Sequence, residues 1–138
     1  MGALIQRVGT NYIPVEDPQK SSRWYQEIIG AVEKYSDHEK AIIDLANQSF
    51  FLVKAQSGER ANFFDHRGFE HFCMTFEVDG IEKLRELHAY LQEKEVMVGN
   101  IEDRGHQGNN FIFIDVDGNK FDVWSELSPD FKERYGIN

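Results

Sequence analysis

The chain has 138 residues, of which 41% are hydrophobic and 28% are charged, and its formal net charge is -9 at pH 7. This length fits one compact domain or two tightly fused small modules, and the composition is typical of a globular protein. The acidic charge excludes a general nucleic-acid binder, because such a surface repels phosphate backbones.

The single cysteine, Cys73, excludes an internal disulfide and favours a reducing compartment. No apolar run approaches the length of a membrane span, and the N-terminus lacks the pattern of a signal peptide. We therefore expect a cytoplasmic protein with neither a membrane nor nucleic acid among its partners.

Residues 1–55 have the pattern of a strand, a helix and three further strands. Residues 4–16 are rich in β-forming residues, and an Asp-Pro start with a later glycine stop predicts a helix over 18–29. Turn signals separate the three expected strands that follow, which are 31–36, 40–46 and 49–55. Residues 56–68 are expected to form the loop that links this module to the next.

Residues 69–127 repeat this order. A strand is expected over 69–78, and Asp79 with Glu82 predicts the capped start of an amphipathic helix that runs to about 94. The three expected strands that follow it are 96–102, 109–115 and 120–126. The tail, 128–138, is expected to begin with a short helix.

The repeated order indicates an internal duplication. Val15 and Val78 occupy equivalent places before the two helices, and Asp44 and Asp115 occupy equivalent places before the last turn of each half. The predicted fold class is α+β, with two tandem βαβββ modules whose sheets form one curved, half-open surface.

Three segments that together span nearly the whole chain resemble a known family. They are IPVEDPQKSSRWYQEIIG at 13–30, HFCMTFEVDGIEKLREL at 71–87 and FIFIDVDGNKFDVW at 111–124. They are similar to the vicinal oxygen chelate superfamily, which includes glyoxalase I, bleomycin and fosfomycin resistance proteins, extradiol dioxygenases and methylmalonyl-CoA epimerase. The third segment resembles the family's Asp-Pro-Asp-Gly-Asn turn, with Val116 in place of the proline. The resemblance implies a glyoxalase-like fold, a small-molecule ligand in the concave groove and a homodimer.

In metal-dependent members of this superfamily, the first strand of each half supplies His or Gln and the last strand supplies Glu. Those positions fall on Thr10 and Cys73, and on Phe51 and Asp122, of which only Asp122 keeps the carboxylate. The standard site is therefore absent, and the chain is not glyoxalase I itself. His71 shares a strand face with Cys73, Thr75 and Glu77, because residues i and i+2 of a strand lie on the same side, so His71 and Asp122 form the predicted metal pair. The ion would be divalent, such as Zn, Fe, Mn or Ni.

The other candidate residues lie on the same strands and in a glycine-punctuated loop. Arg104 could clamp an anionic substrate, and His106 could act as a general acid or base. Glu77 is the only acid on the His71 stripe and is a second candidate for catalysis. The predicted substrate-binding residues are Thr10, Cys73, Arg104 and Trp124. The alternative for the loop is that its charges are simply solvated.

Phenylalanines gather at 61–72, where Phe63 and Phe64 are adjacent. Two neighbouring large apolar side chains in a loop need to be covered, either by the core or by a partner subunit or pocket wall. Trp24 and His88 are interpreted as structural residues of their helices.

Two functions remain open at this point. The first is a metal-dependent lyase, isomerase or oxygenase that polarises vicinal oxygens of a small substrate. The second is a metal-free protein that binds or sequesters a drug-like molecule, as bleomycin resistance proteins do. The missing ligands at Thr10 and Phe51 favour the second, and the acidic charge suits a cationic ligand. A thiol-dependent activity at Cys73 ranks last, because no helix N-terminus lowers its pKa.

Overall fold

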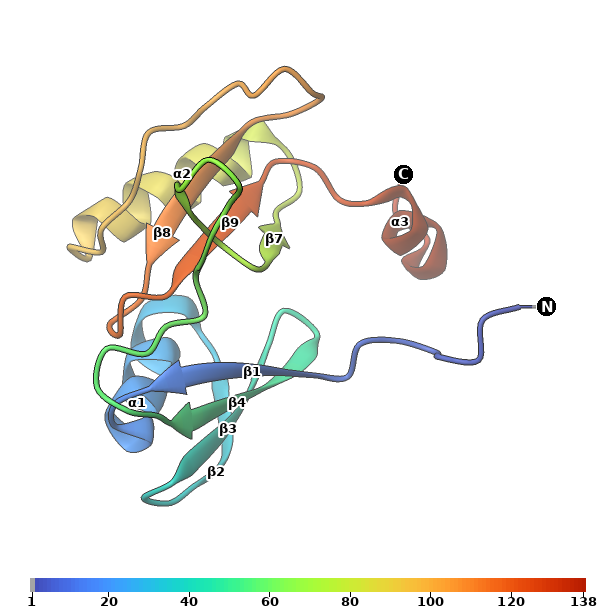
Figure 1. The fold of residues 1–138 in the computed structure, drawn as a ribbon. Helices are drawn as coiled ribbons and strands as arrows, with labels where there is room; N and C mark the ends of the chain where they lie inside the picture. Colours follow the sequence, from blue (N-terminus) through green and yellow to red (C-terminus); the bar gives the residue numbers. More distant parts are fainter. Residues whose placement is uncertain (1) are drawn as a thin grey trace. The chain divides into compact units, whose positions relative to one another are not determined.

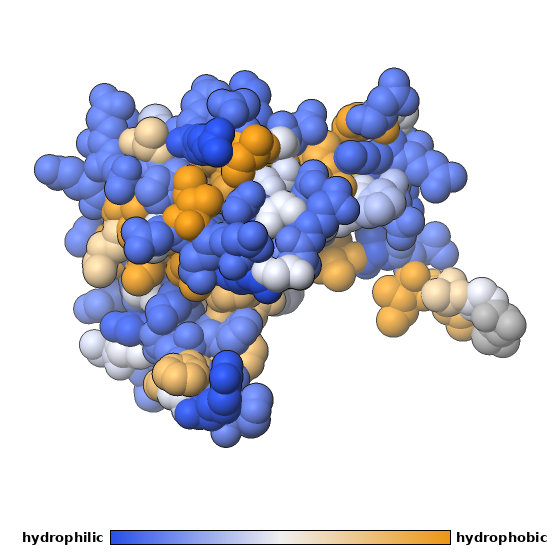
Figure 2. All heavy atoms as spheres, turned by 90° about the horizontal axis from the view of Figure 1, so that it is seen from above, coloured by the Kyte–Doolittle hydropathy of each residue, from blue (hydrophilic) through white to orange (hydrophobic). Residues whose placement is uncertain are grey.

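The computed structural model describes residues 2–138, which divide into two compact units that meet at Arg60 and Ala61. Figure 1 shows the helices and the longer strands of both units along the chain. No helix within residues 2–138 is long and apolar enough to cross a lipid bilayer. The face seen in Figure 2 is mostly hydrophilic, with its hydrophobic residues in small groups.

The first unit is a four-stranded sheet with one helix. Its elements are β1 (Thr10–Val15), α1 (Pro18–Ile29), β2 (Val32–Ser36), β3 (Lys40–Leu45) and β4 (Gln48–Lys54). The strand order is β1-β4-β3-β2, and β1 runs parallel to β4. These elements confirm the predicted order, although the first strand begins at Thr10 and not at residue 4. Pro14 lies on the edge strand β1, where its missing N–H does not interrupt a ladder on both sides.

Helix α1 begins and ends where its capping residues predict. Asp17 Oδ1 accepts a hydrogen bond from the Lys20 N–H at 3.2 Å, and Gly30 adopts the left-handed conformation with φ 75°. The helix contacts β2, β3 and β4. Alternate strand residues such as Ile13 and Leu52 are buried, whereas Tyr12 is 66% exposed. One face of this sheet is therefore core and the other is open.

The second unit repeats the core topology of the first. Its elements are β5 (Phe63–Phe64), β6 (Glu70–His71), β7 (Thr75–Glu77), α2 (Ile81–Glu93), β8 (Asn110–Ile114), β9 (Lys120–Trp124) and α3 (Pro129–Tyr135). The strand order β7-β9-β8, with β7 parallel to β9, matches the order β1-β4-β3. In Figure 1, α2 lies behind β8 and β9. The duplicated order predicted from the sequence is visible in these matching ladders.

The expected strand over 69–78 is not continuous. It is split into β6, which pairs with β5 in a two-stranded sheet, and β7, which pairs with β9. The prediction that His71 and Cys73 share one face with Thr75 is therefore wrong, because alternation holds only along an unbroken extended chain. The strand expected over 96–102 forms only the isolated bridges Val98–Phe113 and Glu102–Asn110.

Two smaller predictions are also corrected. The N-cap of α2 is Gly80, with φ 103° and no side-chain cap, and not Asp79. The Gly80 N–H bonds to the Ser125 carbonyl at 3.0 Å, so the chain turns one residue later than expected. The predicted equivalence of Asp44 and Asp115 is wrong by one residue. Asp44 pairs with Ser49 in the ladder of β3 and β4, and the pair at the same place in the ladder of β8 and β9 is Ile114 with Lys120. Asp115 therefore belongs to the turn.

The hairpin from β5 to β6 exposes its phenylalanines. Phe63, Phe64 and Phe69 are 49%, 69% and 63% exposed, so the core of the unit does not cover them. His71 stacks on Phe63 with ring centroids 5.2 Å apart. The core of the second unit therefore leaves these three side chains exposed, whereas Phe72 of the same cluster is half-buried.

The turn between β8 and β9 is held by the buried carboxylate of Asp115. Its Oδ1 accepts hydrogen bonds from the N–H groups of Asp117 and Asn119, both at 2.9 Å, and its Oδ2 accepts one from Asn119 Nδ2 at 3.0 Å. Asn119 Oδ1 in turn accepts the Ala61 N–H at 2.8 Å. This network fixes the register with which β9 leaves the turn.

We expect Asp115→Ala to lower the free energy of unfolding by about 2 kcal/mol, because it leaves buried N–H donors without an acceptor. Val116→Ala, in the same turn but at a side chain that is 43% exposed, is the matched control and is expected to change it by less than about 0.5 kcal/mol. Urea unfolding measures both variants. Equal losses would contradict a special role for the Asp115 carboxylate.

Candidate functional site

Most of the predicted site residues line one pocket of the second unit. The pocket has a volume of about 610 Å³, which is in the usual range for small-molecule sites. The predicted residues that line it are Glu77, Arg104, His106, Asp122 and Trp124. The pocket also includes Phe72, for whose cluster a pocket wall was one of the alternatives, and Thr75 and Asn110, which were not among the predicted binding residues.

The carboxylate of Asp122 is the centre of the polar network in this pocket. The residue is only 2% exposed. Its Oδ2 accepts hydrogen bonds from Thr75 Oγ1 at 2.9 Å and from Asn110 Nδ2 at 2.8 Å. The strand register explains both contacts, because Thr75 pairs with Asp122 across β7 and β9 while Asn110 pairs with Trp124, two residues further along β9. Thr75 and Asn110 are thus the direct and diagonal neighbours of Asp122 on one sheet face.

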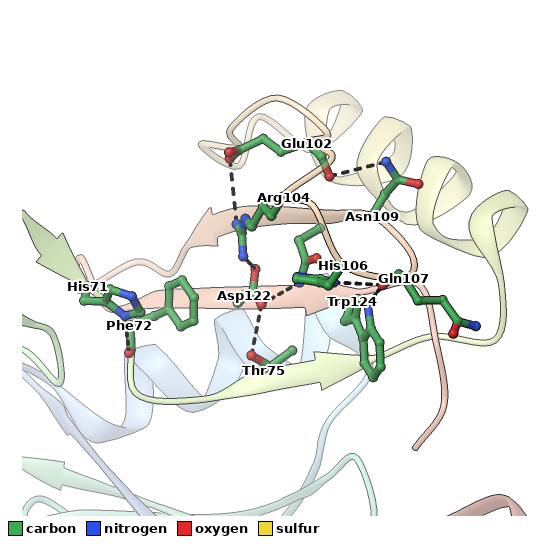
Figure 3. A network of polar contacts seen from close by, with 11 residues as sticks. His71, Phe72, Thr75, Glu102, Arg104, His106, Gln107, Asn109, Asp122 and Trp124 are labelled. Carbon is green, nitrogen blue, oxygen red and sulfur yellow. Dashed lines mark hydrogen bonds and ion pairs between the residues drawn. The ribbon is translucent and has the colours of Figure 1, made fainter. Parts of the chain in front are cut away.

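Arg104 supplies the counter-charge from the loop before β8. Its Nη1 lies 3.0 Å from Asp122 Oδ1, and its Nη2 lies 3.7 Å from Glu102 Oε1. The guanidinium carbon is 5.7 Å from the centre of the Phe72 ring. Figure 3 shows the side chain pointing from the loop toward Asp122. Arg104 therefore lies between two carboxylates and close to an aromatic ring, with its side chain 25% exposed.

The loop that carries Arg104 is fastened to the end of β9. Trp124 Nε1 donates to the Gln107 carbonyl at 2.9 Å, and the Asn109 N–H donates to Ser125 Oγ at 2.8 Å. Gly108 has φ 79°, and a Cβ at this position would lie 2.7 Å from both Ser125 Oγ and Trp124 Nε1. Only glycine fits there, so Gly108 sets how closely the loop approaches the strand.

His106 lies in the same loop, beside Trp124. Its Nδ1 is 2.8 Å from the Gln107 carbonyl oxygen, and the two rings meet edge to face with centroids 6.1 Å apart. Since a carbonyl only accepts, Nδ1 must carry the hydrogen, and in the neutral ring Nε2 is the nitrogen that can accept. His106 can therefore offer a ligand an acceptor at Nε2.

Glu77 lines the pocket, but its carboxylate already has partners. Oε1 accepts the N–H of Ser128 at 2.8 Å, and Oε2 accepts the hydroxyl of the same residue. Ser128 precedes α3, so Glu77 holds the start of this helix. These contacts give Glu77 a structural task in addition to its place in the pocket wall.

Three predicted site residues are not among those that line this pocket, namely Thr10, His71 and Cys73. Thr10 begins β1 in the first unit. His71 donates from Nδ1 to the Phe72 carbonyl at 3.0 Å and packs against the Phe72 ring, and Figure 3 shows it on the far side of Phe72 from Asp122. Cys73 is exposed in the segment between β6 and β7.

The described residues do not fit a metal ion at Asp122. Between residues 2 and 138, no group of three or more His, Cys, Asp or Glu side chains is placed to hold one. One oxygen of Asp122 faces the Arg104 guanidinium and the other accepts two hydrogen bonds, so a cation already occupies the side where a metal would bind. The donor set is that of a buried carboxylate paired with a partly exposed guanidinium.

The duplication places an aromatic pair at the equivalent position of the first unit. There Tyr12 pairs with Phe51 across β1 and β4, as Thr75 pairs with Asp122 across β7 and β9. The ring centroids of Tyr12 and Phe51 are 5.4 Å apart. At this ladder position, the second unit has a polar pair where the first has an aromatic one.

The sequence matches no family model and no curated protein. Solved structures, however, share its fold over most of its length. A lactoylglutathione lyase from Agrobacterium tumefaciens is 14% identical, with a TM-score of 0.70 over 89% of this chain and 96% of that one. The fosfomycin resistance protein FosX from Listeria monocytogenes, complexed with Mn(II) and sulfate, is 18% identical, with a TM-score of 0.72 over 96% of this chain and 99% of that one. These likenesses confirm the predicted α+β, glyoxalase-like fold.

We expect Asp122→Ala to lower the free energy of unfolding by about 3 kcal/mol, because it removes one of the two carboxylates beside Arg104 and leaves the Asn110 amide and the Thr75 hydroxyl without their acceptor. Glu86→Ala, which removes an exposed carboxylate that pairs with Lys83 on α2, is expected to cost less than about 0.5 kcal/mol. Chemical unfolding compares the two variants. A loss at Asp122 no larger than that at Glu86 would show that the ion pair does not stabilise the unit.

We expect Gly108→Ala to cost about 2–3 kcal/mol, because the new methyl group meets Ser125 and Trp124 in addition to the strain of a positive φ. Gly105→Ala separates these two causes, since Gly105 has φ 87° but nothing within 4 Å of an added Cβ. Its expected cost is about 1 kcal/mol. In a Trp24→Phe background, only Gly108→Ala should also shift the fluorescence of Trp124. Identical behaviour of the two variants would contradict the close packing of this loop.

Proposed function

We propose that this chain, which has the fold of the vicinal oxygen chelate superfamily, binds a small organic molecule in the pocket of its second unit without a metal ion. The observation that carries the proposal is the ion pair between the buried Asp122 and the partly exposed Arg104, in a pocket that Phe72 and Trp124 also line. A metal-dependent enzyme would need free ligand oxygens where this chain has an ion pair. Binding is the function that these contacts support best.

Each group in the pocket has a part in the proposal. Phe72 and Trp124 provide apolar surface for the body of the ligand, as aromatic side chains do in most small-molecule sites. Arg104, Asp122 and His106 provide polar contacts that orient it. Glu77 contributes to the wall while it holds Ser128. No reaction is part of the proposal.

The homodimer implied by the family resemblance stays a prediction. The exposed phenylalanines of the hairpin 63–71 form one apolar group of the second unit that a partner subunit could cover. Sedimentation equilibrium of the wild type and of Phe64→Ser measures whether the chain self-associates and whether this hairpin takes part.

A thermal-shift screen of small molecules in the presence of EDTA tests the binding proposal. A ligand at about 100 times its Kd should stabilise the protein by about 2.7 kcal/mol. For such a ligand we expect Trp124→Ala to raise the Kd by at least about tenfold, because it removes a pocket wall. Trp24→Ala, the same change on α1 of the first unit, should leave the Kd within about twofold.

Removal and replacement of metal ions complete this test. Titration calorimetry with EDTA, or with added Mn(II) or Zn(II), should give the same Kd within about twofold if no metal takes part. A ligand that binds only after a metal is added, with a stoichiometric ion retained by the protein, would contradict the proposal and restore the metal-dependent alternative.

A further inference from the structure

We infer that the ligand of this pocket is an organic cation with N–H donors, and that it takes the place of Arg104 at the Asp122 carboxylate. The inference rests on the proposed function, because it names the ligand class of the same pocket. Three observations support this ligand class: two buried oxygen atoms of pocket residues lack a hydrogen-bond donor, carboxylates surround Arg104, and aromatic rings lie beside it.

Two buried oxygen atoms of the pocket residues have no hydrogen-bond donor among residues 2–138, namely Oδ1 of Asn110 and Oδ1 of Asp122. The amide of Asn110 cannot be turned over to solve this, because its Nδ2 donates to Asp122 Oδ2 and the flipped form would set two oxygens together. Asn110 is only 3% exposed. A buried acceptor without a donor is unfavourable, so a ligand that brings a donor gains affinity there.

Arg104 balances the charge of Asp122 but does not form a hydrogen bond with its Oδ1 atom. Its Nη1 is close to Asp122 Oδ1, at 3.0 Å, yet this oxygen receives no well-directed hydrogen bond. An ammonium or amidinium group that enters along a better direction can form the bond that Arg104 does not. A ligand cation can therefore replace Arg104 as the partner of the Asp122 carboxylate.

The charges around Arg104 favour a cation over an anion. Glu102 lies within 3.7 Å of one side of the guanidinium and Asp122 lies on the other, and Glu77 also lines the pocket. An anionic ligand at Arg104 would meet these carboxylates and be repelled. A cation meets acceptors instead.

The position of Arg104 makes the exchange inexpensive. Its loop neighbours Asp103 and Gly105 are exposed, and its own side chain is 25% exposed. When a ligand takes Asp122, Arg104 can keep its second carboxylate, Glu102. Neither the ligand nor Arg104 is then left as an unpaired charge, which is the costly outcome in a buried site.

The aromatic rings and the acceptors define the ligand further. Phe72 already lies 5.7 Å from the Arg104 cation, and Trp124 and His106 add ring surface to the same pocket. Asn110 Oδ1 and Asp122 Oδ1 are both acceptors without a donor, and both residues line the pocket. A primary ammonium, amidinium or guanidinium group on a flat apolar body meets both requirements, whereas a quaternary ammonium group has no N–H to give.

Titration calorimetry in EDTA with four probes tests this inference. The probes are benzylammonium, benzamidinium, benzyltrimethylammonium and phenylacetate. They are compared on the wild type and on Arg104→Gln, Asp122→Asn and Arg85→Gln. Arg85, an exposed arginine on α2 that pairs with Glu82, is the matched control for loss of one positive charge.

We expect benzamidinium and benzylammonium to bind at least about tenfold more tightly than the other two probes. Arg104→Gln removes the internal competitor, so it should tighten benzamidinium binding by about tenfold. Asp122→Asn should weaken it by at least about tenfold, and Arg85→Gln should leave it within about twofold. If Asp122→Asn does not fold, the tightening by Arg104→Gln carries the test alone.

Three results would overturn the inference. Phenylacetate that binds the wild type and is lost in Arg104→Gln would make Arg104 an anion clamp, and the proposed function would stand with another ligand class. Equal binding of benzyltrimethylammonium and benzylammonium would remove the role of N–H donors. Absence of binding by every probe would end the cation inference, and the proposed function itself would fall only if the thermal-shift screen were also empty.

Discussion

The buried carboxylate of Asp122 is the constraint around which the second unit is arranged. An ionised carboxylate that is 2% exposed is strongly unfavourable unless charged and polar partners surround it. Those partners come from three separate segments: Thr75 from β7, Asn110 from β8 and Arg104 from the loop before β8. The partners of this one side chain thus come from the two strands that flank β9 and from a loop, and residues of all these segments line the pocket.

The same ladder position in the first unit shows what happens without this constraint. Tyr12 and Phe51 need no counter-ion, and their rings simply contact each other. The two units share a strand order but differ in chemistry at this position. The first unit has Tyr12 and Phe51 where the second has Thr75 and Asp122, and only the carboxylate of Asp122 requires charged and polar neighbours. A duplicated fold can therefore keep its backbone in both copies while only one copy keeps a polar site.

Local patterns predicted the regular parts of the fold well, and the pocket only in part. Capping residues marked α1, and the turn with its following strand singled out Asp122. The break between β6 and β7 was not predictable from the alternation at 69–78, because it depends on pairing with β5 and β9. The contact of Arg104 with Asp122 joins residues from a loop and a strand, and its geometry depends on how closely Gly108 lets that loop approach. Such tertiary contacts leave no periodic signal in the sequence.

The contacts of Glu77 couple the pocket to the C-terminal segment. Its two carboxylate oxygens hold the backbone and hydroxyl of Ser128, and the residue also lines the pocket. A ligand group that donates to Glu77 competes with Ser128 for the same lone pairs, so occupancy and the docking of α3 are thermodynamically linked. The coupling is reciprocal: a partner that binds α3 and separates Ser128 from Glu77 changes the ligand affinity of the pocket by the same factor by which the ligand changes the affinity for that partner. Helix α3 can thus influence ligand binding although none of its residues lines the pocket.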